Sequence, residues 1–278
     1  MFARLRNQFK LTFNLKVDSP LCIRSGEESI DPTLPDMRCI RSNKNGECVV
    51  FIPGSSIKGV IRTQCEKIFN ILAEKKIVCD IVSDKSNKSN KRSECNSISK
   101  DLNGEETYKA LCPACKMFGS MSLGGRIKFK DAYPINNKFK IGYRNCVKIN
   151  RITGAAEGKG LYDFEVVEDG KFQVTITGDN YELYQLKVLL LALDDINEGY
   201  VTFGSSSTRG NGKMLVEDLK LQIREYRESA KSLQGYYESD KGKALEYKQK
   251  GYYKVLEIDG LEEVLNLVED IDIKNSVV

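Results

Sequence analysis

Histidine is absent from the 278-residue chain. Its absence excludes Ser-His-Asp and Cys-His catalysis by this chain alone, a ribonuclease mechanism that uses two histidines, and every zinc site that includes histidine. Any acid–base or metal chemistry must therefore use Asp, Glu, Lys, Tyr or Cys side chains.

Long apolar runs are also missing. No run approaches the ~18 residues that a membrane-spanning helix needs, so we expect no membrane partner. The first residues, Met1–Arg6, contain no apolar stretch of the kind found in secretion signals, and we therefore expect a cytoplasmic protein. The chain is nevertheless 41% hydrophobic, which is enough to form a core and excludes global disorder.

The charge is only mildly basic but unevenly distributed. There are 43 basic and 39 acidic residues, a net charge of +4. Residues 222–278 hold 9 Lys/Arg and 12 Asp/Glu, which leaves a net charge of +7 for residues 1–221. A basic body is compatible with a polyanionic partner such as nucleic acid.

The chain has nine cysteines, an odd number that argues against a disulfide framework. Four of them, Cys79, Cys95, Cys112 and Cys115, follow the spacing C-x15-C-x16-C-x2-C around a polar stretch without a core pattern. We expect residues 76–118 to be an insertion held by a structural Zn²⁺ ion on these four thiolates. The alternative interpretation is four unrelated thiols.

Hydrophobic periodicity predicts an α+β fold. Alternating residues predict strands at 9–18, 125–132, 172–176 and 213–217, whereas helical spacing predicts helices at 55–72 and 184–196. A long hairpin is expected at 146–168. Without the insertion and the hairpin, the order is close to the ferredoxin-like, RNA-recognition-like βαββαβ arrangement. Residues 1–221 would form this core, and residues 222–278 a helical, acidic C-terminal extension.

Two motifs could bind phosphate. Residues 51–59 join a strand to a helix start, where Ser55 or Ser56 is the expected N-cap and Lys58 supplies a positive charge. Residues 204–213, GSSSTRGNGK, place small hydrogen-bonding residues and Arg209 between glycines. An ordinary capped helix and a flexible hairpin loop are the alternative interpretations.

Together these motifs carry a resemblance to a known family. IPGSSIKGVIR (52–62), CPACKMFG (112–119), GRIKFKDAY (125–133), NRIT (150–153) and GSSSTRGNGK (204–213) follow one another in the chain. In this order they resemble the repeat-associated mysterious protein (RAMP) superfamily, and most closely the backbone subunit of type III CRISPR effector complexes. The resemblance covers roughly residues 8–221. The four-cysteine insertion is similar to family variants that carry zinc.

The resemblance implies a role in a ribonucleoprotein. Several copies would stack along a CRISPR guide RNA beside other effector subunits, and the hairpin would act as a thumb that enters the duplex of guide and target RNA. Guide contacts would come from the helix start, the thumb and the glycine-rich loop, namely Ser55, Ser56, Lys58, Arg62, Arg151, Arg209 and Gly210.

The resemblance also implies an endoribonuclease active on the target RNA. An Asp after the first strand would act with Mg²⁺ or Mn²⁺ while the 2′-OH attacks the adjacent phosphorus. That Asp falls best on Asp36, with Asp31 as the runner-up. The alternatives are a guide-binding subunit without catalysis and an endonuclease that processes the CRISPR precursor; the absence of histidine counts against the latter.

Overall fold

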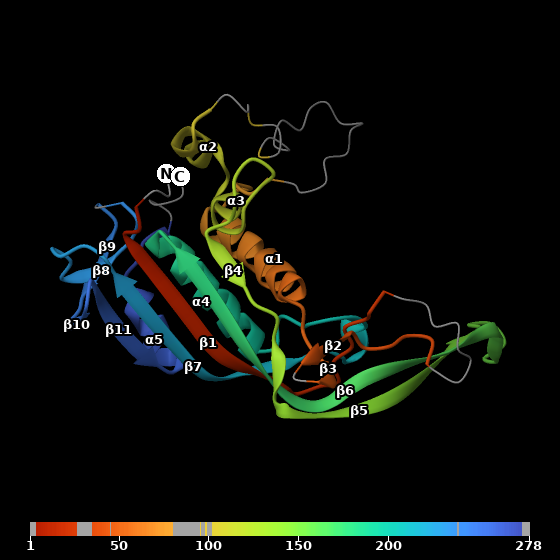
Figure 1. Ribbon diagram of the computed structural model, residues 1–278. Helices are drawn as coiled ribbons and strands as arrows, with labels where there is room; N and C mark the ends of the chain where they lie inside the picture. The colour runs from red at the N-terminus through yellow and green to blue at the C-terminus, as the bar shows by residue number, and fades with distance from the viewer. Residues whose placement is uncertain are drawn as a thin grey trace.

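The computed structural model describes residues 4–26, 35–44, 46–79, 95, 98, 102–237 and 239–273. A seven-stranded sheet forms the body of the molecule, in the order β10-β11-β7-β1-β6-β4, with β5 also paired to β6 (Figure 1). Every pairing in it is antiparallel. Its strands are β1 Asn7–Val17, β4 Ile127–Phe129, β5 Tyr133–Ile149, β6 Ala156–Asp179, β7 Met214–Glu225, β10 Lys248–Lys250 and β11 Tyr253–Asp259. The predicted mixed α+β class is therefore confirmed.

Strand β1 lies between β6 and β7, and its pattern of burial shows that the two faces of the sheet differ. Its odd-numbered residues from Phe9 to Val17 are buried, whereas Lys10 is exposed and Thr12 is half-buried. Since successive side chains of a strand point to opposite faces, one face of the sheet joins the core and the other stays polar.

Two long helices cover the apolar face (Figure 1). Helix α1, Gly54–Leu72, buries Ile57, Ile61 and Cys65 at the spacing that the sequence predicts. Helix α4, Leu183–Asn197, packs against α1, β7 and the C-terminal helix α5, Leu261–Val268. Because α4 packs against elements on several sides, most of its residues are buried and apolar. No helix in the described part of the chain is both long and apolar enough to cross a bilayer.

The start of α1 differs from the prediction. Neither Ser55 nor Ser56 is the N-cap; Pro53 takes that position, with no side-chain cap of its own. Instead, the Asp131 carboxylate accepts a hydrogen bond from the Gly54 backbone N–H at 2.7 Å. A cap supplied by the chain segment after β4 thus replaces the local cap expected from the sequence.

The hairpin is longer than predicted. Strands β5 and β6 form it, and β6 continues without a break into the sheet, so the strand expected at 172–176 belongs to the same element. The polar stretch 168–170 does not interrupt β6, although the pairing with β5 shifts register between Pro134 and Phe139 and again between Lys140 and Ile141. The hairpin extends well beyond the body of the molecule (Figure 1).

The prediction of a helical C-terminal extension is wrong. Within its described residues, strands β8 Ser232–Gln234, β9 Lys241–Ala244, β10 and β11 outnumber the single helix α5. Strand β11 pairs along β7, from Lys254 opposite Glu225 to Asp259 opposite Lys220. The expected boundary at residue 221 lies inside β7.

Smaller elements lie around the sheet. Strands β2 Arg41–Lys44 and β3 Glu47–Val50 form a hairpin before α1, and helices α2 Gly104–Ala110 and α3 Pro113–Phe118 follow α1 in the chain. Helix α3 packs against α1 and β4.

Candidate metal centre and nucleic-acid interface

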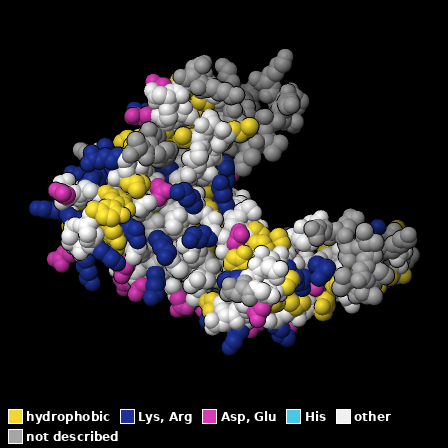
Figure 2. Space-filling model, in the orientation of Figure 1, with side chains coloured by type: hydrophobic (Ala, Val, Ile, Leu, Met, Phe, Trp, Pro, Cys, Tyr) yellow, Lys and Arg dark blue, Asp and Glu magenta, His cyan; other side chains and the backbone are white. Residues whose placement is uncertain are grey.

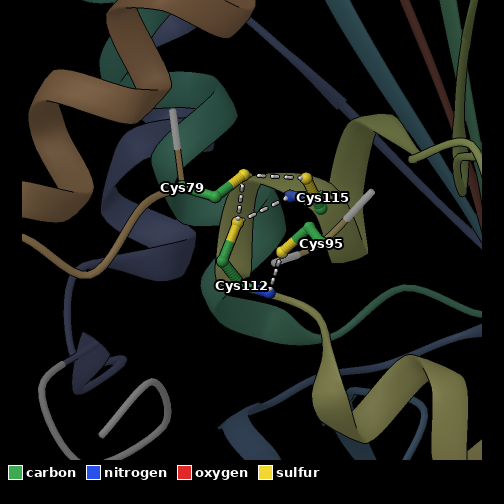
Figure 3. A group of neighbouring side chains, drawn as sticks. All are labelled: Cys79, Cys95, Cys112 and Cys115. Atoms are coloured by element: carbon green, nitrogen blue, oxygen red, sulfur yellow. Dashed lines mark hydrogen bonds between the residues drawn. The ribbon is translucent and has the colours of Figure 1, made fainter. Parts of the chain in front are cut away.

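Four cysteine side chains point toward one another at the start of α3 (Figure 3). The Sγ atoms of Cys79, Cys95, Cys112 and Cys115 all lie within 4.8 Å of one another. The Sγ of Cys79 is 3.5 Å from that of Cys115 and 3.6 Å from that of Cys112. Tetrahedral zinc with Zn–S bonds of about 2.3 Å needs S–S distances of about 3.8 Å. The predicted ligands therefore meet in a group that could hold a metal ion such as zinc.

The Cys-Pro-Ala-Cys turn arranges two of these thiols. Cys112 is the N-cap of α3, and its Sγ accepts a hydrogen bond from the Cys115 backbone N–H at 3.4 Å. Pro113, which has no N–H to satisfy, occupies the first turn. Hydrogen bonds from the thiols of Cys115 and Cys95 lower the pKa of Cys112, which favours the thiolate that binds metal.

Arg62 lies against this cysteine cluster. One of its Nη atoms is 3.6 Å from the Cys115 Sγ, and its Nε donates to the Glu66 carboxylate at 2.8 Å. The Arg62 side chain is 18% exposed. Its guanidinium thus faces the cysteine cluster, and its charge would offset that of four thiolates around a divalent ion.

The glycine-rich loop is held by close backbone contacts. The backbone N–H of Ser205 donates to the Cys22 carbonyl oxygen, and the N–H of Gly212 donates to that of Pro20. A Cβ on Gly204 would lie 2.3 Å from the Cys22 carbonyl oxygen, and one on Gly212 would lie 2.0 Å from that of Phe203. Both positions therefore require glycine. Between them, residues 207–209 form one 3₁₀ turn that ends at Gly210.

The same loop is tied to the base of the hairpin. Arg209 donates from Nη1 to the Tyr162 hydroxyl at 2.6 Å, and Arg144 donates to the Asn211 side-chain oxygen at 2.8 Å. Asn211 is buried, whereas Arg209 is exposed. The loop therefore exposes the positive charge of Arg209 next to the surface of strands β5 and β6.

Asp36 reaches the same part of the hairpin. Its backbone N–H donates to the Asp163 carboxylate at 3.1 Å, and its own carboxylate accepts from the Asp163 backbone N–H at 3.3 Å. The exposed Asp36 and the half-buried Asp163 thus each bind the other's backbone N–H through a carboxylate, and Asp163 follows Tyr162 in the chain. Carboxylate oxygens are the donors that Mg²⁺ prefers. The runner-up, Asp31, lies outside the described residues.

A buried ion pair fixes the segment that carries Asp36. Glu165 on β6 is 3% exposed and receives two hydrogen bonds from the Arg41 guanidinium, at 2.8 and 3.1 Å. Its carboxylate also accepts from the Cys39 backbone N–H at 3.0 Å. Removing one partner of such a buried pair is strongly destabilising, so Glu165 and Arg41 position the segment on the hairpin.

The other predicted RNA contacts are distributed along the surface. Ser55 is exposed and Ser56 and Lys58 are half-buried in the first turn of α1. Arg151 lies in the exposed turn at the hairpin tip, beyond the end of β5 and seven residues after Arg144 in the chain. Among the described residues, no hydrogen bond or ion pair joins Arg151 to the glycine-rich loop.

Sequence reasoning missed the hairpin side of this site. Arg144, Tyr162, Asp163 and Glu165 hold the glycine-rich loop and the Asp36 segment, yet none stands in a recognisable motif. In the sequence, these four residues are recognisable only as polar side chains in or just before the segment expected to form the hairpin. The partners lie 47 to 127 residues apart in the chain, so only the fold pairs them.

Comparison with protein families identifies the class. The model of the RAMP superfamily matches residues 14–215, most of the chain, and the protein belongs to this superfamily. Membership suggests a CRISPR-associated, RNA-binding subunit, in a superfamily that includes some endoribonucleases. A search of the curated proteins finds no match.

Proposed function

We propose that this chain is the backbone subunit of a type III CRISPR ribonucleoprotein, which binds guide RNA and cleaves complementary target RNA. The main support is the convergence of three segments at the hairpin base: the glycine-rich loop with Arg209, the hairpin with Tyr162, and the segment with Asp36. A cation for phosphate and a carboxylate for chemistry thus contact neighbouring residues of one strand, Tyr162 and Asp163 of β6. Other effector subunits and further copies of this chain are the proposed partners.

The strand order supports an RNA-recognition-like core. Four strands, β7-β1-β6-β4, are neighbours in that order, with α1 between β1 and β4 in the chain and α4 between β6 and β7. This is the arrangement expected of a ferredoxin-like βαββαβ unit. We propose that the cysteine insertion, the hairpin and the C-terminal strands are additions to this unit.

Guide binding is assigned to surface groups near the loop. Arg209 and Gly210 would meet phosphates at the glycine-rich loop, and Ser55, Ser56 and Lys58 would do so at the start of α1. There, Asp131 already occupies the Gly54 N–H, so side chains would carry these contacts. Arg62 could contact phosphate only after release from Glu66 and Cys115. Arg151 would act at the hairpin tip.

Replacing Arg209 by alanine should weaken guide-RNA binding whatever the guide sequence. Loss of one phosphate contact should lower the slope of log K against log salt by about 0.7. Fluorescence anisotropy at several salt concentrations measures both quantities. Lys171→Ala is the matched control, because Lys171 is an exposed cation paired with Glu217, and it should change neither.

Tyr162→Phe separates RNA contact from hairpin support. It removes the hydrogen bond to Arg209 but leaves the guanidinium in place. Guide affinity should stay within about twofold of wild type. If Tyr162→Phe weakens binding as much as Arg209→Ala, Arg209 acts by holding the hairpin and the assigned contact is wrong.

The hairpin tip should matter more for target RNA than for guide RNA. Ile152, at the tip, is 95% exposed, as befits an apolar wedge. Ile149 pairs with Ala156, so a two-residue Asn-Gly turn can replace residues 150–155 and keep the strands paired. We expect guide binding to weaken by no more than the single Arg151 contact, and target engagement by the assembled complex to weaken more. Unchanged target binding and cleavage would leave the tip without a role.

A binding subunit without catalysis is the second candidate function. The reciprocal hydrogen bonds of Asp36 and Asp163 favour it, because they give both carboxylates a structural task. Reconstitution with guide and complementary target RNA distinguishes the two candidates: a ladder of products that EDTA suppresses supports cleavage, and intact target bound by the complex supports the binding subunit.

A further inference from the structure

A second polar surface lies far from the hairpin base, on the sheet face that the helices leave open. A hollow of about 330 Å³ opens there beside the first residues of β1. Lys and Arg side chains are spread over this face (Figure 2). The hollow is lined by Gln8, Phe9, Lys10, Lys128, Thr177, Asp179, Gln222 and Arg224.

The charges in this hollow favour an anionic ligand. It contains three cations and one carboxylate, that of Asp179, which already binds Lys128 at 2.5 Å and the Gln8 amide at 2.7 Å. Lys10 is exposed and forms no ion pair with any residue in the described part of the chain. A net positive, solvent-open hollow with hydrogen-bonding amides suits phosphate groups.

A cluster of tyrosines borders the hollow. Arg224 lies over the Tyr253 ring, 4.8 Å from its centroid, and the Tyr226 hydroxyl donates to the side chain of Gln8. Tyr252 stacks on Tyr226 with their ring centroids 6.0 Å apart. Tyr252 is still 79% exposed. An exposed ring held in place by a second ring offers a stacking surface for an unpaired base.

This surface is separate from the guide contacts proposed above. It lies near Gln8 at the beginning of β1, whereas the last residue of the glycine-rich loop, Lys213, contacts Asp18 and Ser19 after the end of β1. Nine residues of strand between Gln8 and Val17 span roughly 30 Å. Lys10, Arg224 and the three tyrosines also fall outside the residues that match the RAMP model.

We propose that this tyrosine surface, formed by Lys10, Lys128, Arg224, Tyr252 and Tyr253, binds single-stranded RNA without sequence preference. The cations meet the phosphodiester backbone and the exposed Tyr252 stacks on a base. A duplex would not suit the site, because its base faces are covered by stacking. The proposal goes beyond the guide-binding and cleavage functions and does not depend on either.

The test uses the purified full chain and a fluorescein-labelled U12 RNA, titrated by anisotropy. Tyr252→Ala should weaken binding about tenfold, while Tyr252→Phe, which keeps the ring, should bind as wild type. Lys10→Gln combined with Arg224→Gln should lower the salt slope by about 1.4, for two lost phosphate contacts. An oligonucleotide with one 5-iodouridine, irradiated on the wild-type protein, should crosslink to Tyr252 or Tyr253.

The controls keep this proposal apart from the guide-binding one. Lys171→Gln, a cation elsewhere on the sheet, should have no effect, and melting temperatures should confirm that every variant folds. If Arg209→Ala weakens U12 binding but Tyr252→Ala and the double variant do not, the tyrosine surface does not bind RNA. If those variants leave RNA binding intact and impair only assembly with protein subunits, the surface docks protein and the proposal is overturned.

Discussion

Replacing Cys112 and Cys115 together by serine is expected to abolish zinc binding and to cause a large loss of stability. The wild-type chain should carry about one zinc per molecule, measured by mass spectrometry of the metal. Structural zinc sites contribute roughly 10–16 kcal/mol of apparent binding free energy in small peptides. Loss of the ion would leave the two remaining thiols, Cys79 and Cys95, without the metal that joins them to α3, and we expect α3 to lose its ordered packing beside α1. A marked fall in melting temperature should accompany the loss of metal.

Two further variants sharpen this experiment. Cys48→Ser is the matched control, because Cys48 is exposed and lies outside the cluster; it should keep both zinc and stability. Arg62→Ala should keep the ligands but weaken zinc retention against a chelator by about tenfold or more, since outer-shell partners commonly have effects of that size. A wild-type protein without zinc, with all four thiols open to alkylation, would contradict the zinc assignment.

Much of the fold could be predicted because its signals are local. The alternation of β1 and the helical spacing of α1 each depend on neighbours within a few residues. The C-terminal strands could not be predicted, because β11 exists through its pairing with β7, some 30 residues earlier in the chain. The prediction of a local N-cap for α1 failed for the same reason, because the group that binds the Gly54 N–H is Asp131, which lies 77 residues away in the chain.

The candidate sites divide in the same way. The cysteine cluster could be predicted because thiol spacing around a polar stretch is itself the signal, and the structure brings the four side chains together. The partners of Asp36 and Arg209 could not, because Asp163 and Tyr162 carry no motif and become neighbours only when the hairpin folds back on the loop. Burial of Glu165 with Arg41 is likewise a property of the packed chain.

Replacing Asp36 by asparagine is expected to abolish target cleavage while leaving guide-RNA binding unchanged. Asparagine keeps an oxygen that can accept the hydrogen bond from the Asp163 backbone N–H, and the Asp36 N–H that donates to Asp163 is untouched. The segment should therefore keep its place, and the substitution removes only the negative charge. A bound Mg²⁺ or Mn²⁺ ion would supply charge neutralisation at the phosphate. In a chain without histidine, a carboxylate is the remaining type of group that both binds such an ion and accepts a proton.

The comparison variants decide which carboxylate acts. Cleavage ladders from the reconstituted complex, with guide RNA, target RNA and Mg²⁺, should disappear for Asp36→Asn and persist for Asp218→Asn, a matched acid on β7. Asp163→Asn should reduce cleavage less than Asp36→Asn if Asp163 mainly holds the segment, and equally if the two carboxylates act together. If Asp36→Asn cuts at the wild-type rate and Asp31→Asn does not, the role passes to Asp31. If both variants cut at full rate, the chain is a binding subunit: the carboxylate pair then only fastens its segment to the hairpin, and the chemistry belongs to another subunit.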